Sequence, residues 1–221
     1  MFKKILNRLK GRAPAKEVFS DIHKKNLWRD SESLSGPGSN SLETQQLVPE
    51  IRDILNEYPI KTVLDVPCGD FNWMKNVSLA GINYIGGDIV EELVEQNNRR
   101  WGKPNICFKT IDIIEDILPM SDLLIVRDCL VHFPDDLVYK ALQNMVRSGC
   151  DYLLTTTFNK RSGHIELKDW GWRPINLEEA PFFFPEPVKL VPEHHPSEEW
   201  KDKCLGLWKM KDIETVQHHW K

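Results

Sequence analysis

Two acidic residues follow short apolar runs, at a spacing that suits a nucleotide ligand. Asp65 ends a run at about 61–66, and Asp88 ends a second run at 82–88, nineteen residues after Gly69. In open α/β sheets, an acid about twenty residues after a glycine turn accepts hydrogen bonds from the hydroxyls of a ribose. The spacing therefore predicts that Asp88 binds the ribose of a nucleoside-containing ligand.

The turn between these two acids indicates which ligand that is. A dinucleotide turn needs the pattern G-x-G-x-x-G to admit a pyrophosphate, whereas Gly69 stands alone between Cys68 and Asp70. A carboxylate at Asp65 would repel a pyrophosphate, but it can pair with the ammonium group of a methionine moiety. The residues favour S-adenosylmethionine over NAD.

A second group of polar residues lies after the fourth expected strand. Methyl transfer from a sulfonium mainly requires alignment of acceptor, carbon and sulfur, and a hydroxyl acceptor also benefits from a base. His132 is the candidate base, because an unperturbed imidazole with a pKa of about 6.5 is largely neutral near pH 7. Packing against the cofactor is an equally good interpretation. Asp128, four residues earlier, could orient the imidazole, act as base itself or bind a divalent ion.

These residues require a parallel sheet to bring them together. Apolar runs predict strands at about 61–66, 82–88, 105–111, 122–127 and 151–157, with two more at 188–191 and 205–208. Helical spacing predicts helices at about 71–80, 90–101 and 134–147, preceded by one over 47–58 that Ser41 or Thr44 could cap. The alternation predicts a Rossmann-like α/β fold with a seven-stranded, mostly parallel sheet flanked by helices.

The sequence resembles the class I S-adenosylmethionine-dependent methyltransferases, and more closely a bacterial and viral group often found beside sugar-processing genes. The resemblance differs from the broad pattern D-x-G-x-G-x-G in one respect, because Pro67 and Phe71 replace its outer glycines. The shared pattern comprises Trp28 and residues 33–39, 65–73, 127–133, 153–158 and 205–208.

The resemblance implies a set of cofactor-binding residues in addition to Asp65 and Asp88. Asp112 would accept from the adenine amino group, with the neighbouring backbone reading the ring edge. Trp28 would supply an apolar wall, and a serine of the loop before the sheet would supply a hydroxyl. Arg127 would pair with an acid or touch the cofactor. The complete set is Trp28, Ser35, Gly36, Ser39, Asp65, Pro67, Cys68, Gly69, Asn72, Asp88, Ile89, Asp112, Ile113 and Arg127.

The chain is expected to form a single methyltransferase domain over 1–221. It divides into a basic N-terminal arm (1–30), a cofactor-covering loop (31–41), a cofactor-binding core (42–158), a substrate-facing insertion (159–200) and the last strand with a tail (201–221). The insertion is rich in proline and aromatic residues, and long structured loops at sheet ends usually carry function. Its side chains predicted to bind a sugar are Trp170, Arg173 and Asn176.

The expected activity is O-methylation of a sugar hydroxyl in a glycan or glycolipid precursor. Methylation of a small molecule or a carboxylate is the alternative enzyme reading. A non-catalytic protein that keeps the fold is a third, against which Asp65, Asp88 and Asp112 argue. Residues 127–130 lack the Asp/Asn-Pro-Pro-aromatic sequence of nucleobase amino methyltransferases. A net charge of −4 gives no reason to expect a nucleic acid partner.

Composition points to the cytoplasm. The five cysteines are widely spaced without a C-x-x-C pair, which suits a reducing compartment, and no apolar run reaches the roughly 20 residues that span a bilayer. The adjacent histidines at 194–195 and 218–219 lack further ligands, so no metal is expected. Residues 1–12 carry five positive charges and an apolar helical stripe. This arm predicts peripheral contact with the inner membrane surface, or packing on its own domain.

Overall fold

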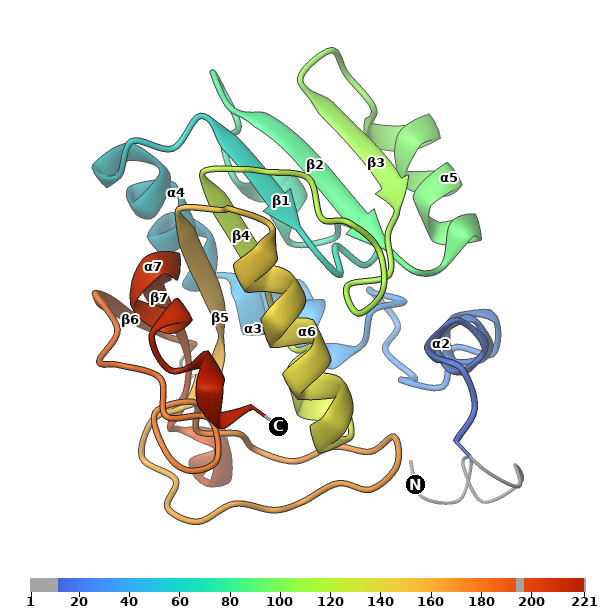
Figure 1. Ribbon diagram of the computed structural model, residues 1–221. Coiled ribbons are helices and arrows are strands. Elements are labelled where there is room, and N and C mark those ends of the chain that lie inside the picture. The colour runs from blue at the N-terminus through green and yellow to red at the C-terminus, as the bar shows by residue number, and fades with distance from the viewer. Residues whose placement is uncertain (1–11, 194–196, 221) are drawn as a thin grey trace.

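The computed structural model describes residues 12–193 and 197–220, which form a seven-stranded sheet with helices on both faces (Figure 1). The spatial order of the strands is β3-β2-β1-β4-β5-β7-β6. β7 runs antiparallel to β5 and β6, and the other pairs are parallel. The predicted mostly parallel sheet is confirmed. Its strands are β1 (Thr62–Asp65), β2 (Asn83–Asp88), β3 (Ile106–Thr110), β4 (Leu123–Val126), β5 (Tyr152–Phe158), β6 (Lys189–Pro192) and β7 (Lys203–Lys209).

Apolar side chains on the two faces of the sheet form two cores. In β1, Val63 packs into one core and Leu64 into the other, because successive side chains of a strand point to opposite faces. One core contains α6, α7 and the inner face of α2, and the other contains α4 and part of α5. Figure 1 shows α6 crossing one face of the sheet in front of β4 and β5. The helices are α2 (Ala15–Lys24), α3 (Ser41–Thr44), α4 (Leu47–Glu57), α5 (Glu91–Trp101), α6 (Asp135–Arg147) and α7 (Met210–Glu214).

The prediction of a helix at 71–80 is wrong. The chain there forms a turn and one short 3-10 helix, Met74–Asn76. Phe71 has a φ of 60°, a left-handed conformation that cannot continue an α-helix. Its ring packs against Tyr84 at 5.2 Å and Phe108 at 5.1 Å between ring centroids. Burial of this ring between two neighbouring strands is incompatible with a regular helix starting at residue 71.

The start of the helical region before β1 also differs from the prediction. The side chain of Asn40, rather than Ser41 or Thr44, caps α3 by accepting from the Glu43 amide at 3.0 Å. α4 then begins at Leu47, and Pro49 lies in its first turn, where the missing N–H costs no helical hydrogen bond.

The insertion is irregular, as its prolines predicted. All of residues 159–188 are described, and they form neither helix nor strand. Two indole N–H groups hold this segment on the sheet and the C-terminal tail. Trp208 donates to the Pro185 carbonyl at 2.7 Å, and Trp220 donates to the Phe182 carbonyl at 2.9 Å.

The N-terminal segment packs across the site end of the sheet. Arg12, which precedes α2, forms an ion pair with Asp136 of α6, and Lys16 of α2 forms one with Glu91 of α5, so this segment bridges two helices of the domain. The amphipathic stripe predicted in residues 1–11 lies outside the described residues. Over residues 12–193 and 197–220, no helix combines the length and apolar character needed to cross a membrane.

Candidate active site

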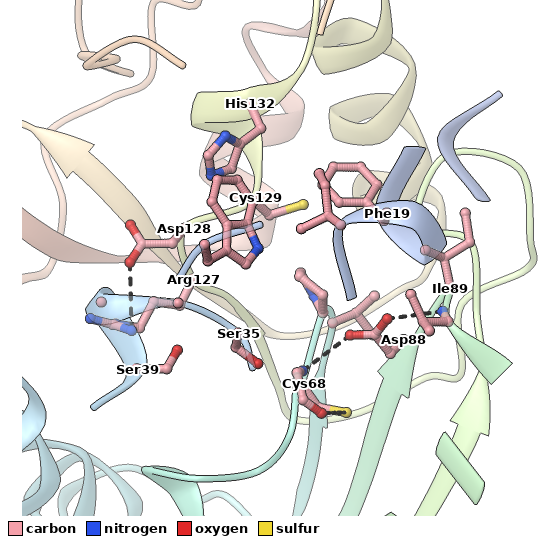
Figure 2. Close-up of a pocket in the computed structure, with 18 of the residues that line it drawn as sticks. Phe19, Ser35, Ser39, Cys68, Asp88, Ile89, Arg127, Asp128, Cys129 and His132 are labelled. Atoms are coloured by element: carbon pink, nitrogen blue, oxygen red, sulfur yellow. Dashed lines mark hydrogen bonds and ion pairs between the residues drawn. The ribbon is translucent and has the colours of Figure 1, made fainter. Parts of the chain in front are cut away.

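A cavity of about 390 Å³ lies at the carboxyl ends of β1, β2 and β4, below α2 and the covering loop. The carboxyl ends of parallel strands are where α/β sheets bind ligands. Every predicted cofactor residue except Asn72 lines this cavity, and so do the predicted catalytic residues Asp128 and His132. In Figure 2, Arg127 and Asp128 lie on one side of the cavity, and Asp88 and Ile89 lie on the other.

Asp88 is held rigidly at the end of β2. Its Oδ2 accepts from the Gly69 amide at 3.1 Å, and its Oδ1 accepts from the Val90 amide at 3.0 Å. Burial raises the pKa of this carboxyl to about 6, although the amides of Val90 and Gly69 favour the charged form. The glycine turn and the acid nineteen residues later, both predicted to bind one ligand, are therefore in direct contact with each other.

Asp65 lies at the end of β1 with an exposed fraction of 2%. The Tyr84 hydroxyl donates to its Oδ2 at 2.6 Å. Burial raises the pKa of Asp65 to about 7, against the opposing effects of this hydrogen bond and the Arg127 charge. A cationic group entering the cavity beside Asp65 would favour its ionised form.

Asp112 follows β3 and is half-buried. Its Oδ1 accepts from the Ile114 amide at 2.8 Å, while burial and then the neighbouring acids raise its pKa. Asp112 and Ile113 both line the cavity. The ends of three consecutive strands in the sheet thus contribute one acid each.

The covering loop is fastened by a residue that the sequence prediction missed. The carboxylate of Asp70 accepts from the Ser33 hydroxyl at 3.0 Å, the Leu34 amide at 2.8 Å and the Ser35 hydroxyl at 3.1 Å. In return, the Asp70 amide donates to Ser35 Oγ at 2.9 Å. The signal in the sequence was the run of small polar residues at 33–39, which offers donors to an acid directly after the glycine turn.

Asn72 has a different role from the one predicted. It does not line the cavity. Its side-chain amide donates to Glu32 Oε1 at 2.7 Å and to the Ser39 carbonyl at 3.0 Å. Asn72 therefore holds the covering loop instead of contacting a ligand.

Gly69 allows the covering loop to approach the turn. Its φ is +56°, and a Cβ atom at this position would lie 2.1 Å from Ser35 Oγ. Any side chain here would be strained and would displace the serine. The glycine thus serves the fit between loop and turn as well as the approach of a ligand.

Asp128 belongs to an ion cluster that includes the buried residues Arg127 and Glu193. Its Oδ2 lies 2.7 Å from Lys203 Nζ and 3.5 Å from an Arg127 nitrogen. Burial would raise the Asp128 pKa, but Lys203 and Arg127 lower it to about 2. Glu193 completes the cluster by pairing with Arg127 and, at 3.3 Å, with Lys203. So acidic a carboxyl is a weak base, which disfavours Asp128 as the proton acceptor.

His132 is oriented by a backbone group, not by Asp128. Its Nδ1 lies 2.8 Å from the Gly171 carbonyl, which can only accept, so the neutral ring carries its proton on Nδ1. Burial lowers the pKa of His132, and the Gly171 contact opposes this effect. The ring lies 5.0 Å from the Trp28 ring between centroids. The orienting role predicted for Asp128 is therefore corrected.

The three predicted substrate-binding side chains do not reach the cavity. Trp170 is buried between Phe19 and Phe133, and its indole donates to the Ala13 carbonyl at 2.8 Å. Arg173 is 1% exposed and pairs with Asp135 at 2.8 Å. The Asn176 amide donates to the Arg161 carbonyl at 2.9 Å. These groups stabilise the insertion, while Phe158, Trp172, Trp200 and Lys203, which the prediction missed, line the cavity instead.

The described residues contain no group of three or more histidine, cysteine or acidic side chains arranged to hold a metal ion. His218, whose Nδ1 lies 3.0 Å from the Thr215 carbonyl, is an exposed residue of the C-terminal tail. His194 and His195 lie outside the described residues.

Comparison with known proteins identifies the fold. No protein-family model and no curated protein sequence matches the chain. Among solved structures, magnesium protoporphyrin IX methyltransferase from Synechocystis PCC 6803 with bound SAM superimposes with a TM-score of 0.61 at 14% identity, over 90% of this chain and 98% of that one. The N-methyltransferase NodS from Bradyrhizobium japonicum WM9 gives 0.54 at 15% identity, over 78% and 98%.

Human N-acetylserotonin methyltransferase in complex with SAM gives a TM-score of 0.58 at 16% identity, over 89% of this chain. This chain spans 60% of the length of that human protein. All three likenesses cover more than three quarters of this chain, and none is close in sequence. The chain has the fold of the class I S-adenosylmethionine-dependent methyltransferases, as its resemblance to them implied.

Proposed function

We propose that this protein is an S-adenosylmethionine-dependent methyltransferase that methylates a hydroxyl group of a sugar. The observation that carries the proposal is the environment of Asp88. Its carboxylate is buried at a strand end, fixed by two backbone amides and directed at a cavity that two further acids line. Structural packing alone gives no reason for three acids to line one cavity, because buried carboxylates cost free energy unless they are paired.

The residues present fit this cofactor. Asp88 suits the two ribose hydroxyls, Asp112 suits an adenine amino group, and Asp65 suits the ammonium of a methionine moiety. A volume of about 390 Å³ lies within the range of cofactor pockets. When bound, S-adenosylmethionine supplies an electrophilic methyl group on a sulfonium.

His132 is the residue proposed to handle the proton. With Nδ1 donating to the Gly171 carbonyl, the neutral ring has its lone pair on Nε2, which can take the proton of an acceptor hydroxyl as the oxygen attacks. The lowered pKa keeps this imidazole neutral at physiological pH. Asp128, Lys203 and Arg127 then supply fixed charges beside the acceptor.

A sugar acceptor rests on the sequence resemblance to a group found beside sugar-processing genes. The fold does not select an acceptor. The names of the compared structures illustrate this, because one is an N-methyltransferase and another acts on magnesium protoporphyrin IX. The location that we propose for the protein is the cytoplasm, as its sequence led us to expect.

Calorimetric titration with S-adenosylhomocysteine tests the cofactor assignment. The wild-type protein is expected to bind with a micromolar dissociation constant. Asp88→Ala should weaken binding at least about 100-fold, because each lost charge-assisted hydrogen bond is worth roughly 1.5–3 kcal/mol. Asp53→Ala removes an exposed carboxylate of α4 and is the matched control. Equal affinities of wild type and Asp88→Ala would refute the ribose assignment.

A further inference from the structure

Trp172 is a large aromatic side chain that remains 41% exposed while lining the cavity. Its neighbours are also aromatic. The Trp200 ring lies 4.7 Å away between centroids at an interplanar angle of 79°, and the Phe158 ring lies 6.1 Å away at 87°. The two neighbouring rings therefore hold the indole in place, while part of its surface stays exposed and the residue lines the cavity.

The backbone on both sides of Trp172 is fixed to the turn that carries His132. The Gly171 amide donates to the His132 carbonyl at 3.1 Å, and the Arg173 amide donates to the Val131 carbonyl at 3.0 Å. The Gly171 carbonyl also holds His132 Nδ1. The exposed indole and the proposed base are thus placed relative to each other by three hydrogen bonds.

Polar groups lie beside these aromatic rings. Lys203 is the register partner of Phe158 in the β5–β7 pair. Its Nζ lies 2.7 Å from Asp128 Oδ2, and both residues line the cavity. A partly exposed indole, a hydrogen-bond donor and a carboxylate acceptor therefore line the same cavity as His132.

We propose that Trp172, Asp128 and Lys203 form the acceptor subsite, with Trp172 stacking on the C–H face of a pyranose ring. This inference rests on the proposed methyltransferase function. A pyranose combines an apolar patch of C–H groups with hydroxyls around its rim. The indole removes the patch from water, while Asp128 accepts from one hydroxyl and Lys203 donates to another.

Two other acceptor classes fit these residues less well. A planar phenol would be held best between parallel aromatic faces, whereas Trp172 and Trp200 are nearly perpendicular and the Arg161 guanidinium lies over the Trp200 ring at 5.2 Å. A cationic amine would suit an aromatic cage, but the carboxylates near these rings are already paired, Asp128 with Lys203 and Asp202 with Arg161, so neither is left to balance its charge. A neutral ring with hydroxyls meets neither objection.

The test is equilibrium binding, so that it does not depend on turnover. Saturation-transfer NMR is recorded on protein loaded with S-adenosylhomocysteine and offered the methyl pyranosides of glucose, galactose, mannose and rhamnose. At least one is expected to receive saturation mainly on the protons of one ring face. Trp172→Ala should raise its dissociation constant at least about tenfold, equivalent to about 1.4 kcal/mol. Trp172→Phe should retain part of the affinity, and Trp101→Ala, outside the cavity, should change nothing.

Binding of S-adenosylhomocysteine by the same variants separates this inference from the proposed function. Trp172→Ala should bind it as wild type does. If the wild-type protein does not bind it, the proposed function fails first. If cofactor binding is normal but no pyranoside binds, or if Trp172→Ala binds the pyranoside as tightly as Trp101→Ala does, the acceptor subsite is refuted.

Discussion

At the scale of single residues, the site separates two groups that look like a catalytic pair in the sequence. Asp128 and His132 stand four positions apart, yet the carboxylate pairs with Lys203 and Arg127, while the imidazole pairs with the Gly171 carbonyl. The result is a strongly acidic carboxyl and a weakly basic imidazole in one cavity. Environments that push two pKa values apart commonly assign different roles to the two groups.

His132→Gln tests the role of the imidazole. If His132 takes the acceptor proton, turnover should fall by about 10²–10⁴-fold, the usual contribution of a general base, while affinity for S-adenosylhomocysteine stays nearly constant. The wild-type rate should rise with pH through an apparent pKa below the ordinary histidine value of 6.5, because the base must be neutral and burial lowers its pKa. Steady-state kinetics and calorimetry measure both. Weaker cofactor binding with only a modest loss of turnover would instead indicate a packing role.

At the scale of elements, the covering loop and the β1 turn behave as one unit. A single carboxylate, Asp70, receives three donors from residues 33–35, and Asn72 holds the loop at Glu32 and Ser39. Phe71, between these two anchors, is buried against the strands. The turn after β1, which lines the cavity, therefore also fixes the loop that covers it.

Asp70→Ala should detach the covering loop from the turn without unfolding the sheet. Loss of the hydrogen bonds to a charged acceptor, worth roughly 1.5–3 kcal/mol each when fully formed, should increase amide hydrogen exchange at residues 33–36. Affinity for S-adenosylhomocysteine should fall about tenfold or more, because the ligand must then order the loop. Asp53→Ala provides the control for surface charge. Unchanged exchange and affinity would mean that the covering loop is held by other contacts.

At the scale of the whole molecule, the buried acids couple stability to pH. Asp65 and Asp88 have pKa values of about 7 and about 6, against an ordinary 3.8. The folded state therefore holds protons that the unfolded chain releases. The stability that this contributes is fully present below about pH 3.8 and is lost as pH rises through 6 and 7.

Asp65→Asn isolates this contribution in the ligand-free protein. Urea unfolding of wild type and variant is compared at pH 5 and pH 8. The free energy of unfolding of the variant, relative to that of wild type, should increase from pH 5 to pH 8 by on the order of 3 kcal/mol. The reason is that the asparagine amide has no charge to bury. His132, whose pKa is lowered, acts in the opposite direction below pH 6.5 but is common to both proteins. An equal difference at both pH values would contradict the raised pKa of Asp65.

The basic N-terminal residues are proposed to contact an anionic membrane surface. Deletion of residues 1–11 leaves Arg12 and its ion pair with Asp136 in place. The deletion should abolish sedimentation with vesicles that contain anionic lipid and should spare cofactor binding. One short basic segment binds weakly, so the sedimentation should also decrease in high salt. Failure of the full chain to sediment would leave only packing on its own domain.

The sequence by itself determined the sheet and the strand-end acids that line the cavity. Seven strands could be read from apolar runs, and a mostly parallel sheet from their alternation with helices, because strand formation depends on local composition and alternation. The meeting of Asp65, Asp88 and Asp112 at one cavity could be predicted for the same reason. When each strand end is located and the strands are parallel, their carboxyl ends must meet at one edge.

Only the tertiary structure decided which residues line the cavity together with Asp128 and His132. Lys203 reaches Asp128 from 75 residues away, and no local pattern encodes that pair. Trp170 and Trp172 stand in the same short segment, yet one is buried under α2 and the other lines the cavity, because the hydrogen bonds of Gly171 and Arg173 to the His132 turn set which side chain faces inward. In an irregular insertion no repeating period assigns side chains to faces, so packing against distant elements makes that choice.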